Sequence, residues 1–474
     1  MSFSSPGFIF AFMPVFFTCY FLVPVRWRNG LLMLASLAFY SIDGGVATWV
    51  LIASIVFNYV IGLMIDRRSS SLQRTLLLVI GIVLNLIPLL YYKYWNFFIS
   101  AANDVRGLVN GGPPLALADI LLPAGISFFT FQGLSYLIDI FQRECRPART
   151  MIDFGMYHTL FPQLVAGPIV RYREVETAII RRPVAINDVE QGIFRFCIGL
   201  AKKIIIADSM GVVADSVFNL GAGQLTMAAA WVGALAYTLQ IFFDLSGYSD
   251  MAIGLGRALG FRFPENFDQP YRSLSITEFW RRWHMTLSRW FRDYVYIPLG
   301  GNRRGPWRTY FNLIVVFVLC GLWHGAAYTF LLWGLYHGAL LVAERAGGGA
   351  LLARLPPALA WALTLLLVVV GWVFFRAGTL SHALAVLQAM VGQVSPDAFV
   401  DLAVVLAPDK VLFFTIGWIV AVWPVGRRVR LAGIDSLGVA PRRWLRQLAT
   451  LGLLTYSAAL VATNGFNPFI YFRF

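Results

Sequence analysis

Two histidines stand in settings where an imidazole could take part in chemistry. His284 lies in a segment that mixes many arginines with many tryptophans, and His324 follows the apolar run 313–322. A neutral imidazole with a pKa near the working pH can accept a proton from an attacking hydroxyl, as acyl transfer requires. A lone histidine in an apolar helix is more often a structural hydrogen-bonding residue, so both interpretations of His324 stay open.

Cys320 precedes His324 by one helical turn, which would place both side chains on one helix face. A nucleophile and base that form a covalent acyl-enzyme are one interpretation, and a small buried packing residue is the other. His337 repeats the Trp-His-Gly setting of His324 as Tyr-His-Gly, so it either lines the same cavity or packs. The histidines and scattered carboxylates show no metal-ligand spacing, and we expect no metal and no cofactor.

Arginines cluster around His284 and continue into the glycine-rich stretch 300–305. Guanidinium groups and exposed backbone donors suit phosphate, and acetyl-CoA is a thioester that carries several phosphates. We therefore expect acetyl-CoA as a donor substrate held on the cytoplasmic side. The other interpretation is the ordinary excess of positive charge in cytoplasmic loops. The expected donor-binding residues are Arg281, Arg282, Arg289, Arg292, Arg303 and Arg304.

The composition is that of an integral membrane protein. The 474 residues are 58% hydrophobic and 13% charged, and the mean hydropathy is +0.69. Soluble domains carry about 25% charged residues. The net charge of +14 fits basic loops beside anionic lipid and does not point to nucleic acid. The four cysteines are widely spaced, which predicts free thiols. The N-terminal sequence predicts a first membrane span that is retained in the protein.

Apolar stretches predict about eleven membrane-spanning helices in one domain that covers residues 1–474. Pro88 should kink the span that contains it. Polar residues that recur along 121–141 predict a helix that faces protein. The stretch 157–170 is too rich in proline and glycine for an ordinary span, and the aspartates of Phe-Asp-Leu-Ser-Gly-Tyr-Ser-Asp, 243–250, are expected to border a helix end.

The segment around His284 has the pattern of one amphipathic helix. Aromatic and apolar residues recur every three to four positions, which places them on a single face. Tryptophan and arginine together are typical of a helix at the membrane–water interface, so an anchoring helix without a chemical role is the alternative to a substrate site. The residues of this face are Trp280, Trp283, Leu287, Trp290 and Tyr294.

Longer motifs resemble those of the membrane-bound O-acyltransferases, and in particular the bacterial branch that acetylates alginate. The resemblance rests on EFWRRWHMTLSRWFRDYVYIPLGGN and GLWHGAAYTFLLWGLYHG, with FDLSGYSDMAIGLG and FPENFDQPY upstream and NPFIYFRF at the end. It extends from the N-terminal SFSSPGFIF to the last residue. Matches of this length are far more specific than a short motif.

The resemblance implies an all-α, polytopic, ring-like fold, with re-entrant and interfacial helices around a central tunnel. The family's catalytic histidine matches His324, and its second motif histidine matches His284. The family pattern does not require a cysteine at Cys320, which disfavours the covalent interpretation. We expect the tunnel to be lined by Asp244, Ser246, Tyr248, Trp323, Cys320 and His337.

The working hypothesis is an O-acetyltransferase of the bacterial inner membrane. Its relatives acetylate exopolysaccharides such as alginate or bacterial cellulose together with periplasmic partner proteins. The alternatives are a carrier that moves acetyl groups without transferase chemistry, or a transferase for D-alanine or longer acyl chains. No paired glycine- and proline-interrupted segments are evident in the two halves, which weakens the carrier reading. The aromatic tail, 467–472, is either a partner-binding or a packing element.

Overall fold

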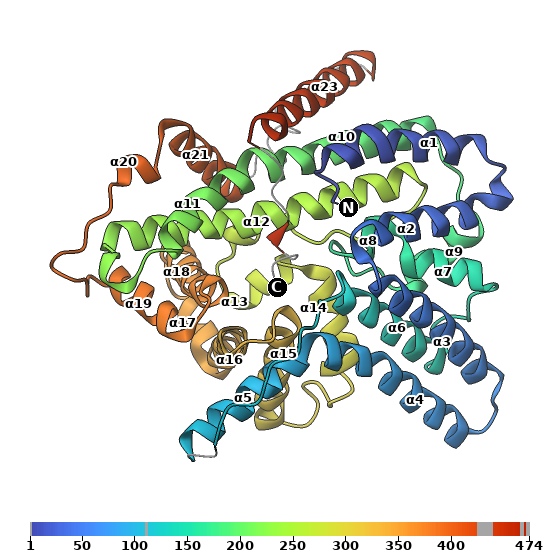
Figure 1. The fold of residues 1–474 in the computed structure, drawn as a ribbon, viewed down its shortest axis with the longest axis horizontal. Coiled ribbons are helices and arrows are strands. Elements are labelled where there is room, and N and C mark those ends of the chain that lie inside the picture. Colours follow the sequence, from blue (N-terminus) through green and yellow to red (C-terminus); the bar gives the residue numbers. More distant parts are fainter. Residues whose placement is uncertain (1, 110–111, 424–438, 465–468, 471–474) are drawn as a thin grey trace. The chain divides into compact units, whose positions relative to one another are not determined.

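The computed structural model describes residues 2–109, 112–423, 439–464 and 469–470. Every regular element within these ranges is a helix, which confirms the predicted all-α class (Figure 1). The chain divides into two compact units: residues 1–189 with 255–264, and residues 190–254 with 265–474. The expectation of a single domain therefore stays a prediction.

The first unit is built from helices of the N-terminal part of the chain. They are η1 (Phe8–Phe12), α1 (Met13–Leu22), η2 (Val25–Trp27), α2 (Arg28–Gly44), α3 (Ala47–Arg67), α4 (Ser71–Leu89), η3 (Leu90–Tyr94), α5 (Trp95–Leu108), α6 (Ile126–Phe141), α7 (Met151–Thr159), α8 (Phe161–Leu164) and α9 (Tyr172–Ile180).

Two long helices, α10 (Ile186–Ala201) and α12 (Met227–Ala258), lie mainly in the second unit. The remaining helices of that unit are η4 (Lys202–Ala207), α11 (Asp208–Phe218), η5 (Ala222–Gln224), η6 (Pro270–Arg272), α13 (Ile276–Arg282), α14 (Met285–Phe291), η7 (Arg292–Tyr296), α15 (Pro306–His324), α16 (Tyr328–Ala343), η8 (Glu344–Gly348), α17 (Gly349–Leu352), α18 (Pro357–Arg376), α19 (Leu380–Met390), α20 (Leu402–Val405), α21 (Pro408–Val422) and α23 (Val439–Asn464).

Six helices among the described residues are long and apolar enough to cross a membrane. Three shorter apolar helices, at 8–22, 126–141 and 380–390, add to them. The protein is thus a multi-pass membrane protein, while the expected number of eleven spans stays a prediction. The six long helices are 47–67, 71–108, 227–258, 306–324, 357–376 and 443–463.

Polar residues in the first unit are buried and bonded to one another. The side-chain amides of Asn58 on α3 and Asn85 on α4 exchange hydrogen bonds of 2.9 and 3.2 Å. Gly133 of α6 leaves room for this pair, because a Cβ there would lie 2.5 Å from the Asn85 oxygen. Nearly all of α6 is buried, as expected for a protein-facing helix.

The span that contains Pro88 changes direction. The π-helix η3 begins two residues after the proline, and the ribbon bends between α4 and α5 (Figure 1). A proline removes one backbone hydrogen bond and crowds the preceding turn, which is an ordinary cause of such a bend. The predicted kink is therefore present.

The aspartates of the 243–250 motif do not border a helix end. Asp244 and Asp250 both lie inside α12, a continuous helix of 32 residues. Gly247 between them serves close packing, because a Cβ there would lie 2.7 Å from the carbonyl oxygen of Gly199 on α10. The sequence signal that suggested a helix end reflects contact between two helices.

Gly192, Gly199, Gly247 and Gly254 bring the backbones of α10 and α12 together. A Cβ on Gly254 would lie 2.5 Å from the Gly192 carbonyl oxygen and 2.7 Å from the Phe196 nitrogen. Small residues at such crossings are a common way for membrane helices to approach closely. A side chain at these positions would separate the helices that carry the charged residues described below.

Gly254→Ala should lower the melting temperature of the detergent-purified protein, because overpacking costs about 1–3 kcal/mol. The matched control is Gly452→Ala on α23, where a Cβ meets nothing within 4 Å. The control should keep or slightly raise the melting temperature, since alanine favours a helix by up to about 1 kcal/mol over glycine. Equal melting temperatures for both variants would contradict the tight packing.

Candidate active site

The segment around His284 is not one helix. α13 ends at Arg282 and α14 begins at Met285, and His284 between them has a left-handed backbone with φ of 43°. Asn266 stabilises this break: its carbonyl oxygen accepts from Met285 N at 2.9 Å, and its side-chain oxygen accepts from Thr286 Oγ1 at 2.8 Å. The prediction of a single amphipathic helix was wrong, because contacts with Asn266 replace the helical turn.

The predicted aromatic face is buried inside the second unit. Trp283 and Leu287 are each 1% exposed, and Trp280, Trp290 and Tyr294 are below a tenth. The Trp283 ring packs 4.8 Å from the Trp372 ring and 5.1 Å from that of Phe267, measured between centroids. These aromatic residues therefore form the protein core around His284 and do not anchor the segment at a water interface.

His284 and His324 lie close together. Their ring centroids are 6.4 Å apart, and both side chains are buried. Trp323 packs against both rings, with centroids 5.9 Å from His284 and 4.8 Å from His324. The structure thus brings together the two histidines that the sequence singled out.

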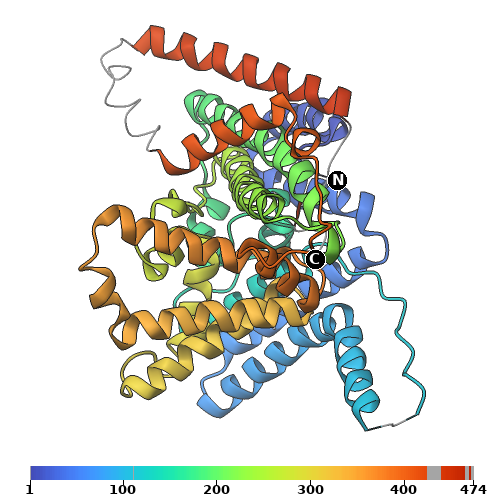
Figure 2. The ribbon, with the colours of Figure 1, turned by 90° about the vertical axis from the view of Figure 1, so that its left-hand side faces the viewer.

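The position of His324 depends on the hairpin of α15 and α16, which run side by side (Figure 1 and Figure 2). His324 is the last residue of α15, and a Cβ on Gly325 after it would collide with the Phe330 ring. Aromatic rings of the hairpin and of α18 enclose the imidazole: Trp333 at 5.3 Å and Phe375 at 5.1 Å. The imidazole is held in an aromatic shell.

His337 on α16 forms the far side of this shell. Its Nδ1 accepts a hydrogen bond of 3.4 Å from Trp280 Nε1, and its ring lies 5.1 Å from that of Trp333. The bond ties α13 to α16, so the geometry gives His337 a packing role beside the histidine pair. Cys320 is buried on α15 one turn before His324. Its expected place on the tunnel wall stays a prediction.

A polar cavity of about 200 Å³ adjoins the break at His284. Asn266 and Phe267 belong to its wall, and the Phe267 ring lies 6.1 Å from the His284 ring. Ser246 lines the cavity, and its expected place on a tunnel wall stays a prediction. The lining consists of Lys202, Phe242, Phe243, Ser246, Ser249, Asp250, Ile253, Glu265, Asn266, Phe267, Asp268, Gln269 and Val420.

Charges at the cavity are paired with one another. Asp250 accepts from Lys202 at 2.6 Å and from Arg195 at 2.9 Å, and Arg195 also bonds Glu265. Asp268, the third carboxylate of the lining, pairs with Arg282 at 3.3 Å. Three cations therefore face three carboxylates, which favours a polar occupant without a large net charge at this point. Sequence reasoning missed Lys202, Glu265 and Asn266 as site residues. The signal was present in the motif Phe-Pro-Glu-Asn-Phe, 263–267, which mixes polar and aromatic residues.

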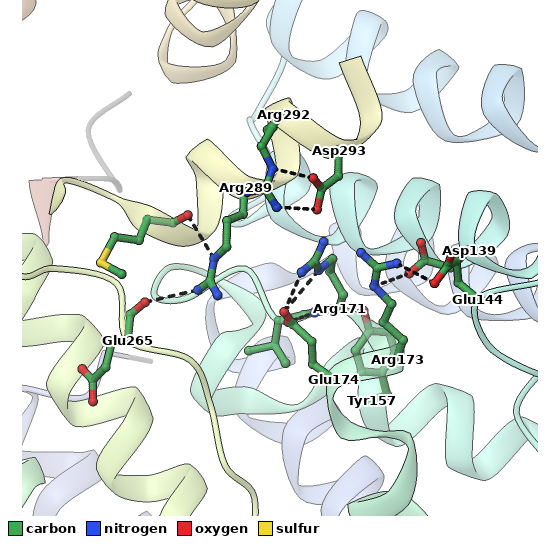
Figure 3. Close-up of polar contacts among 12 residues, drawn as sticks. Asp139, Glu144, Tyr157, Arg171, Arg173, Glu174, Glu265, Arg289, Arg292 and Asp293 are labelled. Carbon is green, nitrogen blue, oxygen red and sulfur yellow. Dashed lines mark hydrogen bonds and ion pairs between the residues drawn. The ribbon is translucent and has the colours of Figure 1, made fainter. Parts of the chain in front are cut away.

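The arginines expected to bind the donor fall into three groups. Arg289 donates to the backbone oxygen of Glu265 at 3.4 Å, beside the cavity (Figure 3). Arg282 and Arg292 pair with carboxylates, at 2.9 Å to Glu278 and 2.7 Å to Asp293. Arg281, Arg303 and Arg304 are exposed.

The distance along α15 separates Arg303 and Arg304 from His324. These two arginines precede the first residue of the helix, and His324 is its last. A rise of 1.5 Å per residue puts roughly 27 Å between the two ends of α15. A donor that bound Arg303 and Arg304 and also reached His324 would have to span about this distance. A nucleotide thioester is a molecule of that elongated kind.

Asp244 and Tyr248 contact a different part of the chain from Ser246. Asp244 pairs with Lys203 at 2.8 Å and accepts from the backbone nitrogen of Ile470 at 2.8 Å. The Phe469 ring packs 4.7 Å from the Tyr248 ring. Phe469 and Ile470 of the aromatic tail thus pack inside the second unit. The rest of the tail, 467–468 and 471–472, lies outside the described residues.

Helical architecture and apolar spans define a multi-pass membrane protein, in which a buried histidine pair lies beside a polar cavity. Residues 149–374 match the model of the membrane-bound O-acyltransferase family. The chain belongs to this family and is an O-acyltransferase. Within the described residues no cluster of three or more possible metal ligands occurs.

Named relatives extend the comparison over the whole chain. The probable alginate O-acetylase AlgI of Pseudomonas aeruginosa is 46% identical over 399 residues, which cover 82% of this chain and 75% of the relative. The probable alginate O-acetylase AlgI of Pseudomonas putida is 40% identical over 498 residues, with complete coverage of both chains. The peptidoglycan O-acetyltransferase of Helicobacter pylori is 38% identical, over 82% and 80% of the two chains.

Burial makes His284 a pH-sensitive element of stability. It lies outside the candidate spans, and desolvation lowers its pKa from 6.5 to about 3. Below pH 6.5 the unfolded chain therefore binds a proton that the folded protein does not. The free energy of unfolding should fall as the pH drops below 6.5, and the slope should approach about 1.4 kcal/mol per pH unit near pH 5.

His284→Gln removes this contribution, so the melting temperature of the variant should depend less on pH between 7 and 5 than that of the unsubstituted protein. Thermal melting in detergent at a series of pH values measures the slope. His382→Gln on α19 is the matched control. An unchanged slope in the His284 variant would contradict a neutral, buried imidazole.

Proposed function

We propose that this protein is a membrane O-acetyltransferase that passes acetyl groups from a cytoplasmic donor to an acceptor for O-acetylation of an exopolysaccharide. The observation that carries the proposal is the buried pair of His284 and His324, 6.4 Å apart between ring centroids. The relatives named alginate O-acetylase and peptidoglycan O-acetyltransferase support acetyl transfer to a polysaccharide. Alginate or bacterial cellulose is the proposed polymer.

His324 acts as the general base in the proposed reaction. Its imidazole accepts the proton of the acceptor hydroxyl while the hydroxyl oxygen attacks the thioester carbonyl carbon. The carbon–sulfur bond then breaks, and the departing thiolate takes the proton from the imidazolium. The aromatic shell of Trp323, Trp333 and Phe375 limits water at this point, which protects the thioester from hydrolysis.

His284 positions the donor or donates a hydrogen bond to the developing oxyanion. A neutral imidazole carries one N–H and can serve as such a donor. The left-handed backbone at His284 and the bonds from Asn266 hold its ring relative to the cavity. Preorganisation of this kind lowers the barrier because no reorientation is needed during the reaction.

Acetyl-CoA is the proposed donor, and its pantetheine arm fits the polar cavity better than its phosphates do. The cavity offers amide and hydroxyl groups from Asn266, Ser246 and Ser249, while its charges are already paired. The phosphates would lie on the arginines outside. The proposed location is the bacterial inner membrane, with a periplasmic partner protein that completes transfer to the polymer.

His324→Ala should lower the rate of acetyl transfer by about 10²- to 10⁴-fold, the usual contribution of a general base. The assay supplies labelled acetyl-CoA and a polysaccharide acceptor to the purified protein and measures released CoA. His382→Ala is the matched control and should keep the rate. Transfer at the unsubstituted rate by the His324 variant would overturn the assignment.

The same assay separates the alternatives. A carrier without transferase chemistry would release no CoA from any variant. A covalent acyl-enzyme on Cys320 would make Cys320→Ala as inactive as the His324 variant and would leave labelled acetyl on the unsubstituted protein. We expect Cys320→Ala to keep transferase activity, since its buried side chain can be replaced by another small apolar one.

Arg289→Gln should raise the KM for acetyl-CoA by about tenfold with little change in kcat, because the guanidinium would contact the donor's phosphates in ground and transition states alike. S-acetyl-pantetheine, which lacks the nucleotide phosphates, is the control donor, and its KM should be nearly the same for both proteins. An equal effect on both donors would instead indicate that Arg289 only supports the loop at Glu265.

A further inference from the structure

An open pocket lies in the second unit away from the residues that line the polar cavity. Its volume is about 530 Å³, within the range of ligand pockets, roughly 300–1,000 Å³. Leu274, Ser275 and Thr277 lead into α13, while the opposite walls come from η8, α17 and the start of α18. The full lining is Leu274, Ser275, Thr277, Glu344, Arg345, Gly349, Leu352, Ala353, Leu355, Pro357 and Ala360.

Arg345 supplies the pocket with a positive charge. The side chain is exposed, and in the part of the chain that the structure describes it forms no salt bridge. The other charged residue of the lining is Glu344, and its carboxylate is already engaged. One oxygen accepts from Ile276 N, and the other accepts from Thr277 N at 2.9 Å and Thr277 Oγ1 at 2.6 Å. Glu344 keeps its negative charge but is directed at the start of α13, so Arg345 is the cation available to an anionic group.

The rest of the wall is largely apolar. Beside the Arg345 cation, this apolar surface is formed by Leu274, Leu352, Leu355 and Pro357. Such a combination suits an amphiphile with an anionic head and a hydrocarbon tail. Arginine binds phosphate through two or more hydrogen bonds, which makes a phosphate the natural head group.

The position of the pocket at the end of a candidate membrane span favours a membrane lipid as the occupant. Pro357 and Ala360 belong to the first turn of α18, a candidate membrane span. The end of a span lies near the level of the lipid head groups, where anionic phospholipids are the abundant amphiphiles. A soluble phosphate would use Arg345 but would leave the apolar wall uncovered.

We propose that this pocket, with Arg345 at the head group and Leu352 and Leu355 along the acyl chain, is a specific binding site for an anionic phospholipid. In the same wall Thr277 donates to Glu344, and this contact fixes the first turn of α13. That helix leads directly to the left-handed residue His284. Lipid binding thus steadies the segment that carries one of the two site histidines.

Delipidated full-length protein in detergent tests the site through its melting temperature as phosphatidylglycerol is added. The unsubstituted protein should be stabilised in a saturable way, and phosphatidylcholine should stabilise it less. Arg345→Gln should weaken the apparent affinity for phosphatidylglycerol by about tenfold, as expected for the loss of charge-assisted hydrogen bonds. Arg354→Gln is the matched control, because Arg354 is exposed on the same segment and does not line the pocket.

A second variant tests the apolar wall without changing charge. Leu352→Trp should fill the pocket and remove saturable stabilisation while the variant still melts cooperatively without lipid. An equal affinity in the Arg345 and Arg354 variants would overturn the proposal. So would equal stabilisation by glycerol 3-phosphate or by CoA, since either result would assign the pocket to a soluble phosphate compound. Neither outcome bears on whether His324 catalyses acetyl transfer.

Discussion

Backbone contact between α15 and α16 is the constraint on which the candidate active site depends. A Cβ on Gly321 would collide with the carbonyl oxygen of Phe330, and one on Gly334 with that of Phe317. At this separation the Trp333 ring reaches His324 from the facing helix. The same contact fixes α16, whose His337 bonds Trp280 and whose following residue Glu344 caps α13. Glycine here sets the geometry of side chains several turns away.

The second constraint is the loop that contains Asn266. The backbone and side chain of Asn266 bond the start of α14, and its side-chain nitrogen Nδ2 donates to Ser249 Oγ on α12 at 3.1 Å. Asn266 thereby joins three segments that are distant in sequence: the motif of α12, the 263–267 stretch and the His284 break. A polar side chain that is fully bonded costs little when buried, whereas one left without partners costs about 1–3 kcal/mol. The cavity beside His284 is therefore built from residues that support one another.

The sequence was sufficient to predict the helical membrane architecture, the protein-facing α6 and the kink at Pro88. It also singled out His284 and His324, because a charged, aromatic segment and a histidine after an apolar run are unusual against a lipid-facing background. The break at His284 could not be predicted, because the spacing of apolar residues continues through it. Its cause is a set of hydrogen bonds accepted by Asn266, eighteen positions earlier. The place of Asp244 and Asp250 inside α12 was missed for a similar reason: serine and glycine between them resemble a helix end until the partner helix α10 is known. The polar cavity depends on such tertiary contacts, and periodicity carries no information about them.

The length and charge of α12 have a consequence for how the protein enters the membrane. At 1.5 Å per residue its 32 residues measure roughly 48 Å, longer than the ~30 Å of hydrocarbon, and most of the helix is covered by protein. Asp244 and Asp250 are neutralised by Lys203 and Lys202, which follow α10 in the chain. Lys203 also has Asp208 in its own segment at 2.7 Å, whereas α12 alone would carry two unpaired carboxylates into the lipid during synthesis. Insertion of α12 together with the segment that holds Lys202 and Lys203, as one charge-balanced unit, avoids this exposure.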